Sequence, residues 1–251
     1  MELTFNGKTA IVTGAASGIG AAIAEELAAS GATVIIADLK LEAAEAEVKR
    51  IEAAGGQALP FEVNVADAKA VEAMVAFAEE KTGGLHMLVN NAGIAGAAAP
   101  IGEYPLDSWK SVIDVNLNGV FYGIRFAIPA LKRAGGGAIV NIASVLGSVG
   151  IANSSAYVTT KHALVGMTKS AALEHAMDNI RVTAVGPAFI NTPLLDNNLD
   201  GDTRKFLETQ HAFNRLGTPE EVASLVVYLL SDKASFITGS YHLVDGAYAA
   251  R

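Results

Sequence analysis

The segment Thr13-Gly14-Ala15-Ala16-Ser17-Gly18-Ile19-Gly20 decides the fold of this 251-residue chain. It joins a β-branched run, Lys8–Thr13, to an Ala- and Glu-rich stretch, Ser17–Ser30, that is typical of a helix. Glycines let the backbone turn sharply and approach a pyrophosphate, while a helix that begins there offers free N–H groups and a partial positive charge. The spacing differs from the commoner G-x-G-x-x-G, so the loop by itself is also compatible with a simple tight turn.

Outward from this loop, short β-branched runs alternate with longer amphipathic stretches. That alternation predicts an α/β protein with a parallel sheet and helices on both faces. We expect one domain over residues 1–251, a single-domain Rossmann fold with a doubly wound seven-stranded parallel sheet. The predicted strands are Lys8–Thr13, Thr33–Ala37, Ala58–Val63, Leu85–Asn90, Ala138–Ile142, Arg181–Val185 and Tyr241–Val244. The predicted helices are Ser17–Ser30, Leu41–Ala54, Ala68–Thr82, Leu106–Ala134 with a bend near Gly119, Ala156–Met177 and Pro219–Leu230. The irregular segment of about residues 186–215 is a candidate lid.

The composition excludes several classes of function. A net charge of −8 argues against nucleic-acid binding, because a phosphate backbone requires a basic surface. The chain has no cysteine, which excludes disulfides, thiolate metal sites and cysteine nucleophiles, and its isolated histidines predict no metal site. The polar start, Met1–Lys8, shows no signal peptide, and no apolar stretch is long enough to span a membrane. We therefore expect a cytoplasmic protein without membrane or nucleic-acid partners.

Asp38 ends the second predicted strand, 18 residues after Gly20. An acidic side chain at that place can accept hydrogen bonds from the ribose hydroxyls of a dinucleotide and would repel a 2′-phosphate. No basic residue lies in the glycine loop or directly after Asp38, although Lys40 is near. The pattern favours NAD over NADP, while a helix-capping role for Asp38 is the alternative.

Tyr157 and Lys161 lie four residues apart in Tyr157-Val158-Thr159-Thr160-Lys161 and so share one helix face. Alone, such a pair is usually a surface contact. Here Ser144 follows the fifth predicted strand, at the edge where open α/β sheets bind ligands. An ammonium beside a phenol favours loss of the phenol proton, so we expect the pKa of Tyr157 to be lowered. A serine hydroxyl that holds the substrate oxygen completes a set suited to carbonyl reduction or alcohol oxidation.

With these motifs in order, the chain resembles the short-chain dehydrogenase/reductase family over essentially its whole length. The family's glycine loop corresponds to Thr13–Gly20, and its Asn-Asn-Ala-Gly segment to Asn90-Asn91-Ala92-Gly93. The resemblance implies a catalytic set of Asn116, Ser144, Tyr157 and Lys161. In it Tyr157 is the acid/base, Ser144 orients the substrate oxygen, and Lys161 binds the nicotinamide ribose and is linked through water to Asn116.

The resemblance also implies which residues hold the cofactor, NAD. Pro187, Ile190 and Thr192 would flank the nicotinamide. Asn64 stands where the family often has an aspartate near adenine, so the strength of that contact is in doubt. The full implied cofactor set is Gly14, Ser17, Gly18, Ile19, Gly20, Asp38, Leu39, Asn64, Val65, Asn91, Ala92, Gly93, Tyr157, Lys161, Pro187, Ile190 and Thr192.

Mostly apolar residues are candidates for the substrate pocket and indicate a hydrophobic or aromatic secondary alcohol or ketone as the small-molecule partner. Some of them could instead simply pack the lid. Gly186-Pro187-Ala188 replaces the family's more usual Pro-Gly pair, and the methyl of Ala188 would reshape the pocket. The candidates are Ser144, Val145, Ile151, Tyr157, Ala188, Phe189 and Leu195, with Ile94, Leu194 and Phe213 as further walls.

Two other functions stay open at this stage. One is reduction of a 3-oxoacyl thioester, which the NAD preference and the acidic surface disfavour but which Arg125, Lys132, Arg133 and Lys169 keep possible. The other is a non-catalytic nucleotide-binding regulatory protein, which the intact catalytic set disfavours. Because cells keep NAD mostly oxidised, we expect alcohol oxidation as the direction. The resemblance further implies a homotetramer built through Leu106–Ala134, Ala156–Met177 and Tyr241–Arg251.

Overall fold

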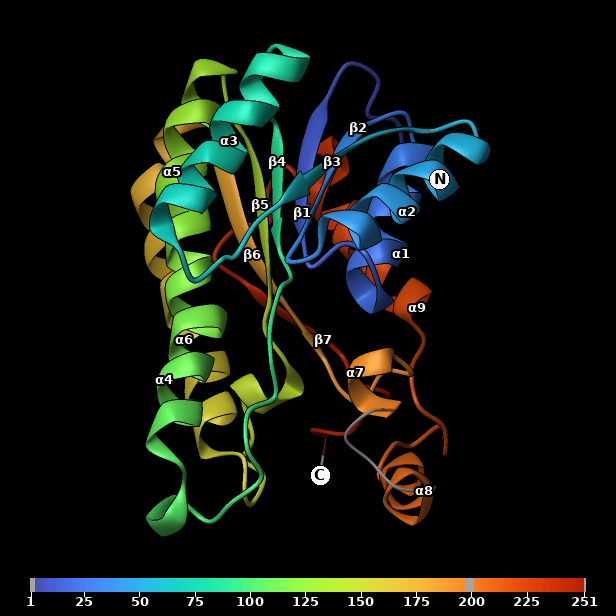
Figure 1. The fold of residues 1–251 in the computed structure, drawn as a ribbon, viewed down its shortest axis with the longest axis vertical. Helices are drawn as coiled ribbons and strands as arrows, with labels where there is room; N and C mark the ends of the chain where they lie inside the picture. The colour runs from blue at the N-terminus through green and yellow to red at the C-terminus, as the bar shows by residue number, and fades with distance from the viewer. Residues whose placement is uncertain (1–2, 197–200, 251) are drawn as a thin grey trace.

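The protein is described by a computed structural model at residues 3–196 and 201–250. Its sheet has seven parallel strands in the order β3-β2-β1-β4-β5-β6-β7 (Figure 1). The strands are β1 (Thr9–Thr13), β2 (Thr33–Asp38), β3 (Gln57–Glu62), β4 (Met87–Asn90), β5 (Gly137–Ile142), β6 (Ile180–Pro187) and β7 (Tyr241–Val244). The prediction of a single-domain, doubly wound, seven-stranded parallel sheet is confirmed.

Helices cover both faces of the sheet. One layer holds α1 (Gly18–Ala29), α2 (Leu41–Ala53) and α9 (Pro219–Leu230), and the other holds α3 (Ala68–Thr82), α5 (Gly119–Arg133) and α6 (Ser155–His175) (Figure 1). The shorter α4 (Leu106–Ile113) precedes α5, and α7 (Pro193–Asp196) and α8 (Gly201–Thr209) lie beyond the carboxyl ends of the strands. This two-layer cover explains why the strands read as continuous apolar runs rather than alternating ones.

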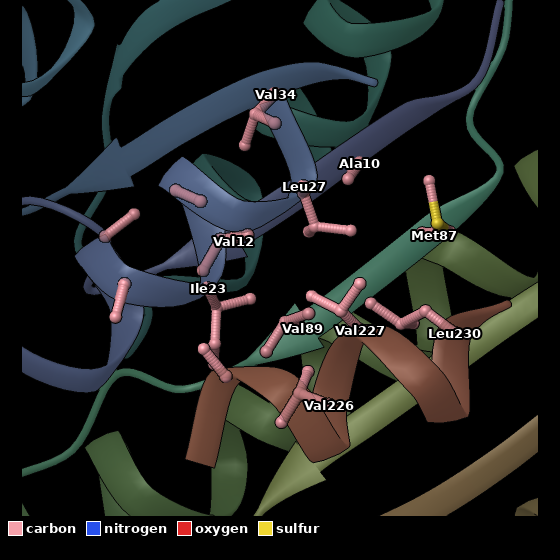
Figure 2. Packing of buried hydrophobic residues seen from close by; sticks show 14 of the residues in the cluster. Ala10, Val12, Ile23, Leu27, Val34, Met87, Val89, Val226, Val227 and Leu230 are labelled. Carbon is pink, nitrogen blue, oxygen red and sulfur yellow. The ribbon is translucent and has the colours of Figure 1, made fainter. Parts of the chain in front are cut away.

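Alternate side chains of one strand enter two separate cores. In β1, Ala10 and Val12 pack with α1 and α9, whereas Ile11 packs on the opposite face. Figure 2 shows the first of these cores, in which Ile23 and Leu27 of α1 face Val226 and Val227 of α9 over the sheet. These side chains are almost completely buried.

Two predicted segments differ from the structure. The predicted helix Leu106–Ala134 is interrupted by a π-helical turn, Asp114–Asn118, which ends directly before Gly119, where a bend was expected. The segment 186–215, predicted as irregular, contains α7 and α8 in its described part, and β6 continues to Pro187. Other predicted boundaries agree to within one or two residues.

The sheet order places the site. β1 pairs with β2 on one side and with β4 on the other, so consecutive connections leave in opposite directions at the carboxyl ends of β1 and β4. Open α/β sheets bind ligands at such a point. Across the described residues, no helix is both long and apolar enough to cross a bilayer.

Candidate active site

The glycine loop between β1 and α1 is shaped by close approaches that a side chain would block. Gly14 and Gly18 have φ values of +62° and +56°, in the left-handed region that favours glycine. A Cβ on Gly20 would lie 2.2 Å from the carbonyl oxygen of Gly14. Ser17, the residue before α1, makes no side-chain cap, and the first turn of the helix holds no acidic residue. The loop therefore presents uncapped N–H groups, as an anion-binding turn requires.

Asp38 closes the far side of this loop. Its carboxylate accepts hydrogen bonds from the backbone N–H of Ala16 at 3.0 Å and of Leu39 at 2.8 Å. The helix-capping alternative is wrong, because α2 begins at Leu41 with Lys40 as its uncapped N-terminal residue. Asp38 is thus fixed at the end of β2 beside the glycine loop, the position expected of a ribose acceptor.

The loop after β4 is tied to the glycine loop by Asn91. Its side-chain amide donates to the carbonyl oxygens of Thr13 and Gly14, at 2.8 and 3.1 Å. The hydroxyl of Thr13 in turn accepts from the backbone N–H groups of Asn91 and Ala92. These bonds make one rigid rim at the carboxyl ends of β1 and β4.

A cavity of about 720 Å³ opens at this edge. Of the predicted cofactor residues, all but Gly20 line it, since Gly20 is buried under the loop. All the predicted substrate residues, from Ser144 to Leu195, line it as well. The structure therefore brings the two predicted sets into one continuous space. Its volume is in the range of ligand sites.

Ser144 and Tyr157 meet inside this cavity. Ser144 follows β5 and has only 7% of its surface exposed, and its hydroxyl accepts from the backbone N–H of Leu146 at 3.2 Å. Burial raises the pKa of Tyr157 above its ordinary value, although a hydrogen bond with Ser144 acts in the opposite direction. The expected lowering of the Tyr157 pKa by the lysine is thus wrong for the chain alone.

Lys161 explains that difference. Its Nζ donates to the carbonyl oxygen of Ile142 at 2.8 Å and lies 5.3 Å from the centre of the Tyr157 ring. Its side chain is buried, which lowers the pKa of Lys161 to about 8. Because burial disfavours the charge on this amine and its Nζ is turned toward a backbone carbonyl, the amine gives the phenol little electrostatic help.

Asn116 lies in the π-helical turn and does not line the cavity. Both ends of its buried amide bond the backbone of Ile94: Oδ1 accepts from the N–H and Nδ2 donates to the carbonyl, each at 2.8 Å. Asn116 therefore fixes the segment after Gly93, which forms a wall of the cavity.

The substrate half of the cavity has mostly apolar walls. Sequence reasoning missed some of them, because they come from short segments whose apolar character is equally typical of core. Phe213, predicted as a wall, is exposed and stacks under Arg215 instead. The side chain of Leu194 is outside the described part of the chain. The missed lining residues are Val63, Ala95, Val115, Ile142, Ala143, Leu146, Ser154, Pro193, Thr203 and Leu207.

No group of three or more His, Asp and Glu side chains is placed to hold a metal within residues 3–196 and 201–250. Among the cavity residues that the structure describes, the ionisable groups are Asp38, Tyr157 and Lys161. The glycine loop and Asp38 fit a dinucleotide, and the other two can exchange a proton.

Known proteins that are similar to this chain include several dehydrogenases and reductases. A family profile described as enoyl-(acyl carrier protein) reductase matches residues 14–249. The chain is 47% identical to a cyclohexanol dehydrogenase of Acinetobacter sp., over 100% of this chain and 98% of that protein. It is 43% identical to a cis-4-hydroxycyclohexanecarboxylate dehydrogenase of Sinomonas cyclohexanicum, over 100% of both. A 3-oxoacyl-[acyl-carrier-protein] reductase of Thermotoga maritima is 38% identical, over 97% of this chain and 98% of that protein.

Solved structures agree with the fold in detail. A short-chain type dehydrogenase/reductase of Mycobacterium marinum superposes with a TM-score of 0.94 at 34% identity, covering 99% of this chain and 98% of that one. A 7α-hydroxysteroid dehydrogenase complexed with NADH has a TM-score of 0.93 at 30% identity, covering 98% and 95%. The predicted enzyme class, an oxidoreductase acting on CH–OH groups, is confirmed by these relatives. The chain belongs to the short-chain dehydrogenase/reductase family.

Proposed function

We propose that this enzyme oxidises a neutral cyclic secondary alcohol to its ketone with NAD. One observation carries the proposal: a single cavity is lined at one end by Asp38, whose carboxylate is fixed by a hydrogen bond, and at the other end by Ser144, Tyr157 and apolar side chains. Two relatives that match the full chain are named for substrates with a hydroxyl on a six-membered ring.

The chain's residues divide the proton chemistry between them. The hydroxyl of Ser144 would hold the substrate oxygen, and the Tyr157 phenolate would take the proton of the substrate hydroxyl. A bound oxidised nicotinamide would supply the hydride acceptor. Lys161 holds the ribose and donates to the phenolate once its ammonium turns from the Ile142 carbonyl. Because the Asn116 amide is already bonded to Ile94, a relay water at this residue would be held by its main-chain carbonyl.

The NAD preference rests on charge at the end of β2. Asp38 places a carboxylate at the cavity, next to Leu39, and none of the described cavity residues near them is basic. A 2′-phosphate would face that carboxylate without a compensating cation, whereas two ribose hydroxyls would donate to it. NADP is disfavoured on this ground.

The preference for a neutral ring rests on the substrate half. Lys161 is the one basic side chain among the cavity residues that the structure describes, and its Nζ donates to the Ile142 carbonyl. A carboxylate on the ring would be desolvated against Ile94, Val145 and Phe189 without a partner, which costs several kcal/mol. Cyclohexanol-like substrates fit better than hydroxy acids.

Reduction of a 3-oxoacyl thioester is the second candidate, favoured by the Thermotoga maritima relative. An acidic carrier protein needs a basic docking patch on its enzyme. Two of the basic residues that could form one are neutralised: Lys132 pairs with Asp178 at 2.8 Å and Arg133 with Glu79 at 2.7 Å. We therefore rank this activity below alcohol oxidation.

A substrate panel tests the proposal. Purified enzyme is assayed by absorbance at 340 nm with NAD and NADP against cyclohexanol, cis-4-hydroxycyclohexanecarboxylate and a 3-hydroxyacyl thioester. We expect the highest kcat/KM for cyclohexanol with NAD. A higher kcat/KM for the thioester, or for NADP, would contradict it.

The remaining properties follow the family resemblance. We infer a homotetramer, a cytoplasmic location and a lid formed by about residues 186–215. The tetramer is supported by exposed apolar side chains on the helices expected to form it, Phe121 of α5 and Leu173 of α6. The lid is supported by Phe189, Leu195 and Leu207, which line the cavity from that segment.

A further inference from the structure

A second tyrosine, Tyr241, reaches the active site from β7. It pairs with Ala184 of β6, so its side chain points to the helix layer that contains α6. Its phenol donates a hydrogen bond to the main-chain carbonyl of Ser144. Tyr241 does not line the cavity and therefore acts on the site from beneath it.

Two glycines make the space for this phenol. A Cβ on Gly186 would lie 2.4 Å from the Tyr241 hydroxyl oxygen and 2.6 Å from a ring carbon. A Cβ on Gly147 would lie 3.2 Å from the same oxygen and 3.0 Å from the carbonyl oxygen of Lys161. The turn that follows Ser144 is thus held between the Tyr241 phenol and the turn of α6 that carries Lys161.

That turn has little stability of its own. It is a single 3₁₀ turn, Val145–Gly147, closed by a 2.8 Å hydrogen bond from the Gly147 N–H to the Ser144 carbonyl. Short 3₁₀ turns have poor hydrogen-bond geometry and need outside support. The Ser144 carbonyl receives that support from the phenol, while its hydroxyl is fixed from the same turn by the Leu146 N–H.

We propose that Tyr241 is a positioning residue: by anchoring the turn at Ser144, it sets the direction in which the Ser144 hydroxyl meets the substrate oxygen and Tyr157. This inference rests on the proposed function of Ser144 and Tyr157. Gly186 is part of the same arrangement, because a side chain at this position would displace the Tyr241 phenol from the Ser144 carbonyl.

The ionisation of Tyr157 provides a second reason. Burial raises the pKa of Tyr157, and a hydrogen bond from Ser144 acts against that rise. Burial raises the pKa of Tyr241 although hydrogen bonds with Ser148 and Gly147 act in the opposite direction, so its phenol stays protonated as a donor. Loss of the anchor at Ser144 therefore weakens the hydrogen bond that lowers the pKa of Tyr157.

The experiment compares Tyr241→Phe and Gly186→Ala with the wild type and with Tyr228→Phe, a tyrosine of α9 outside the cavity. Tyr241→Phe keeps the ring and removes the donor, and Gly186→Ala keeps the donor and removes its space. With cyclohexanol and NAD, we expect both to lower kcat about tenfold with KM changed less than about twofold, the effect of one lost hydrogen bond on the chemical step. The pKa on the acidic limb of the kcat/KM profile rises in Tyr241→Phe, and Tyr228→Phe matches the wild type.

Hydrogen exchange supplies a readout that does not depend on turnover. Amides of residues 144–149 should exchange at least about fivefold faster in Tyr241→Phe than in the wild type or in Tyr228→Phe, because local opening costs less. Unchanged exchange there, an unchanged kcat, or a change confined to KM or to global stability overturns the inference. Wild-type activity in Tyr157→Phe would instead overturn the proposed function. In that case the hydrogen-exchange result alone would decide whether Tyr241 anchors the turn at Ser144.

Discussion

Asp38 shows how one side chain can be assigned from sequence. Its place 18 residues after Gly20 predicts proximity to the glycine loop, and the structure has its carboxylate bonded to Ala16 of that loop. The reason is topological: parallel neighbours β1 and β2 end at the same edge of the sheet. Spacing along the chain therefore predicts position, although it does not show that the carboxylate also braces the loop.

Replacement of Asp38 by Ser should lower the preference for NAD. The serine cannot offer the charge-assisted hydrogen bonds of a carboxylate and no longer repels a phosphate, so the ratio of kcat/KM for NAD over NADP should fall at least about tenfold. Asp67→Asn, which alters an acidic residue outside the cavity, is the matched control. An unaltered ratio in Asp38→Ser would show that the carboxylate does not select the cofactor.

The pKa values of Tyr157 and Lys161 could not be predicted from the sequence. Their four-residue spacing is correct, but the sequence does not show that the Lys161 amine bonds the Ile142 carbonyl or how deeply both groups are buried. Burial opposes charge on either group, and here it decides the direction of both pKa shifts.

Lys161→Met should therefore stabilise the fold while it removes activity. With a pKa of about 8 in the folded chain against 10.5 as its ordinary value, the buried amine carries its full cost below pH 8. After allowing for the lost hydrogen bond, we expect about 2 kcal/mol of added stability at pH 7.

The stability difference between Lys161→Met and the wild type should close as the pH rises from 8 to 10.5, because the wild-type amine is then neutral in the folded state and the unfolded state holds the extra proton. Urea unfolding at several pH values measures this, with Lys169→Met, an exposed lysine of the same helix, as control. A variant less stable than the wild type at pH 7 would contradict the account.

At the scale of elements, the π-helical turn Asp114–Asn118 is the clearest departure from prediction. The sequence 106–134 keeps a helical apolar pattern throughout, and one extra residue in a turn does not alter that pattern enough to be noticed. The turn carries Asn116, and π-helical turns often occur at functional sites.

Asn116→Asp tests what that turn holds. The change places a carboxylate oxygen where the amide nitrogen donates to the Ile94 carbonyl, in a fully buried position. We expect a loss of about 2–4 kcal/mol at pH 7, which becomes smaller in acid as the carboxyl regains a proton to donate. Thermal unfolding against pH measures it, and Asn64→Asp, whose exposed side chain keeps its acceptor role toward Ala66, should be nearly neutral. Equal stability of the two variants would rule out a bracing role for Asn116.

The proposed lid, about residues 186–215, was harder to predict than the sheet for a physical reason. Strands β1, β2 and β5 are buried on both faces and leave an unmistakable apolar run, whereas α7 has only four residues and α8 is short and largely exposed. The same part of the chain is held by contacts between distant residues, such as the packing of His211 against Phe189 and Tyr248. Such contacts have no local signature in the sequence.

At the scale of the whole molecule, the cavity joins residues from nearly every loop at one edge of the sheet. The sequence predicts this convergence, because all seven strands are parallel and their carboxyl ends meet. It does not predict the shape of the substrate half, where the volume depends on how walls from distant segments pack. For this reason the motifs are enough to predict the reaction class, whereas the proposal of a ring-shaped substrate rests on the substrates for which two relatives are named.

The proposed tetramer is also tested at this scale. Phe121 of α5 is 48% exposed, and Phe121→Arg would place a charge in the expected contact between subunits. Light scattering coupled to gel filtration should give about four times the chain mass of 25.8 kDa for the wild type and a smaller species for Phe121→Arg. Phe206→Arg, on α8 and 61% exposed, should leave the assembly unchanged. A monomeric wild type would refute the inferred tetramer.

The central claim is that Tyr157 is the acid/base of an alcohol dehydrogenase, and the most direct measurement is the initial rate of NADH formation at 340 nm in wild type and Tyr157→Phe. With saturating NAD and cyclohexanol, the account predicts that the variant loses at least about 10²–10⁴-fold in kcat. NADH binding, followed by its fluorescence, should be retained, since the glycine loop and Asp38 are untouched. Comparable rates in the two proteins would contradict the account.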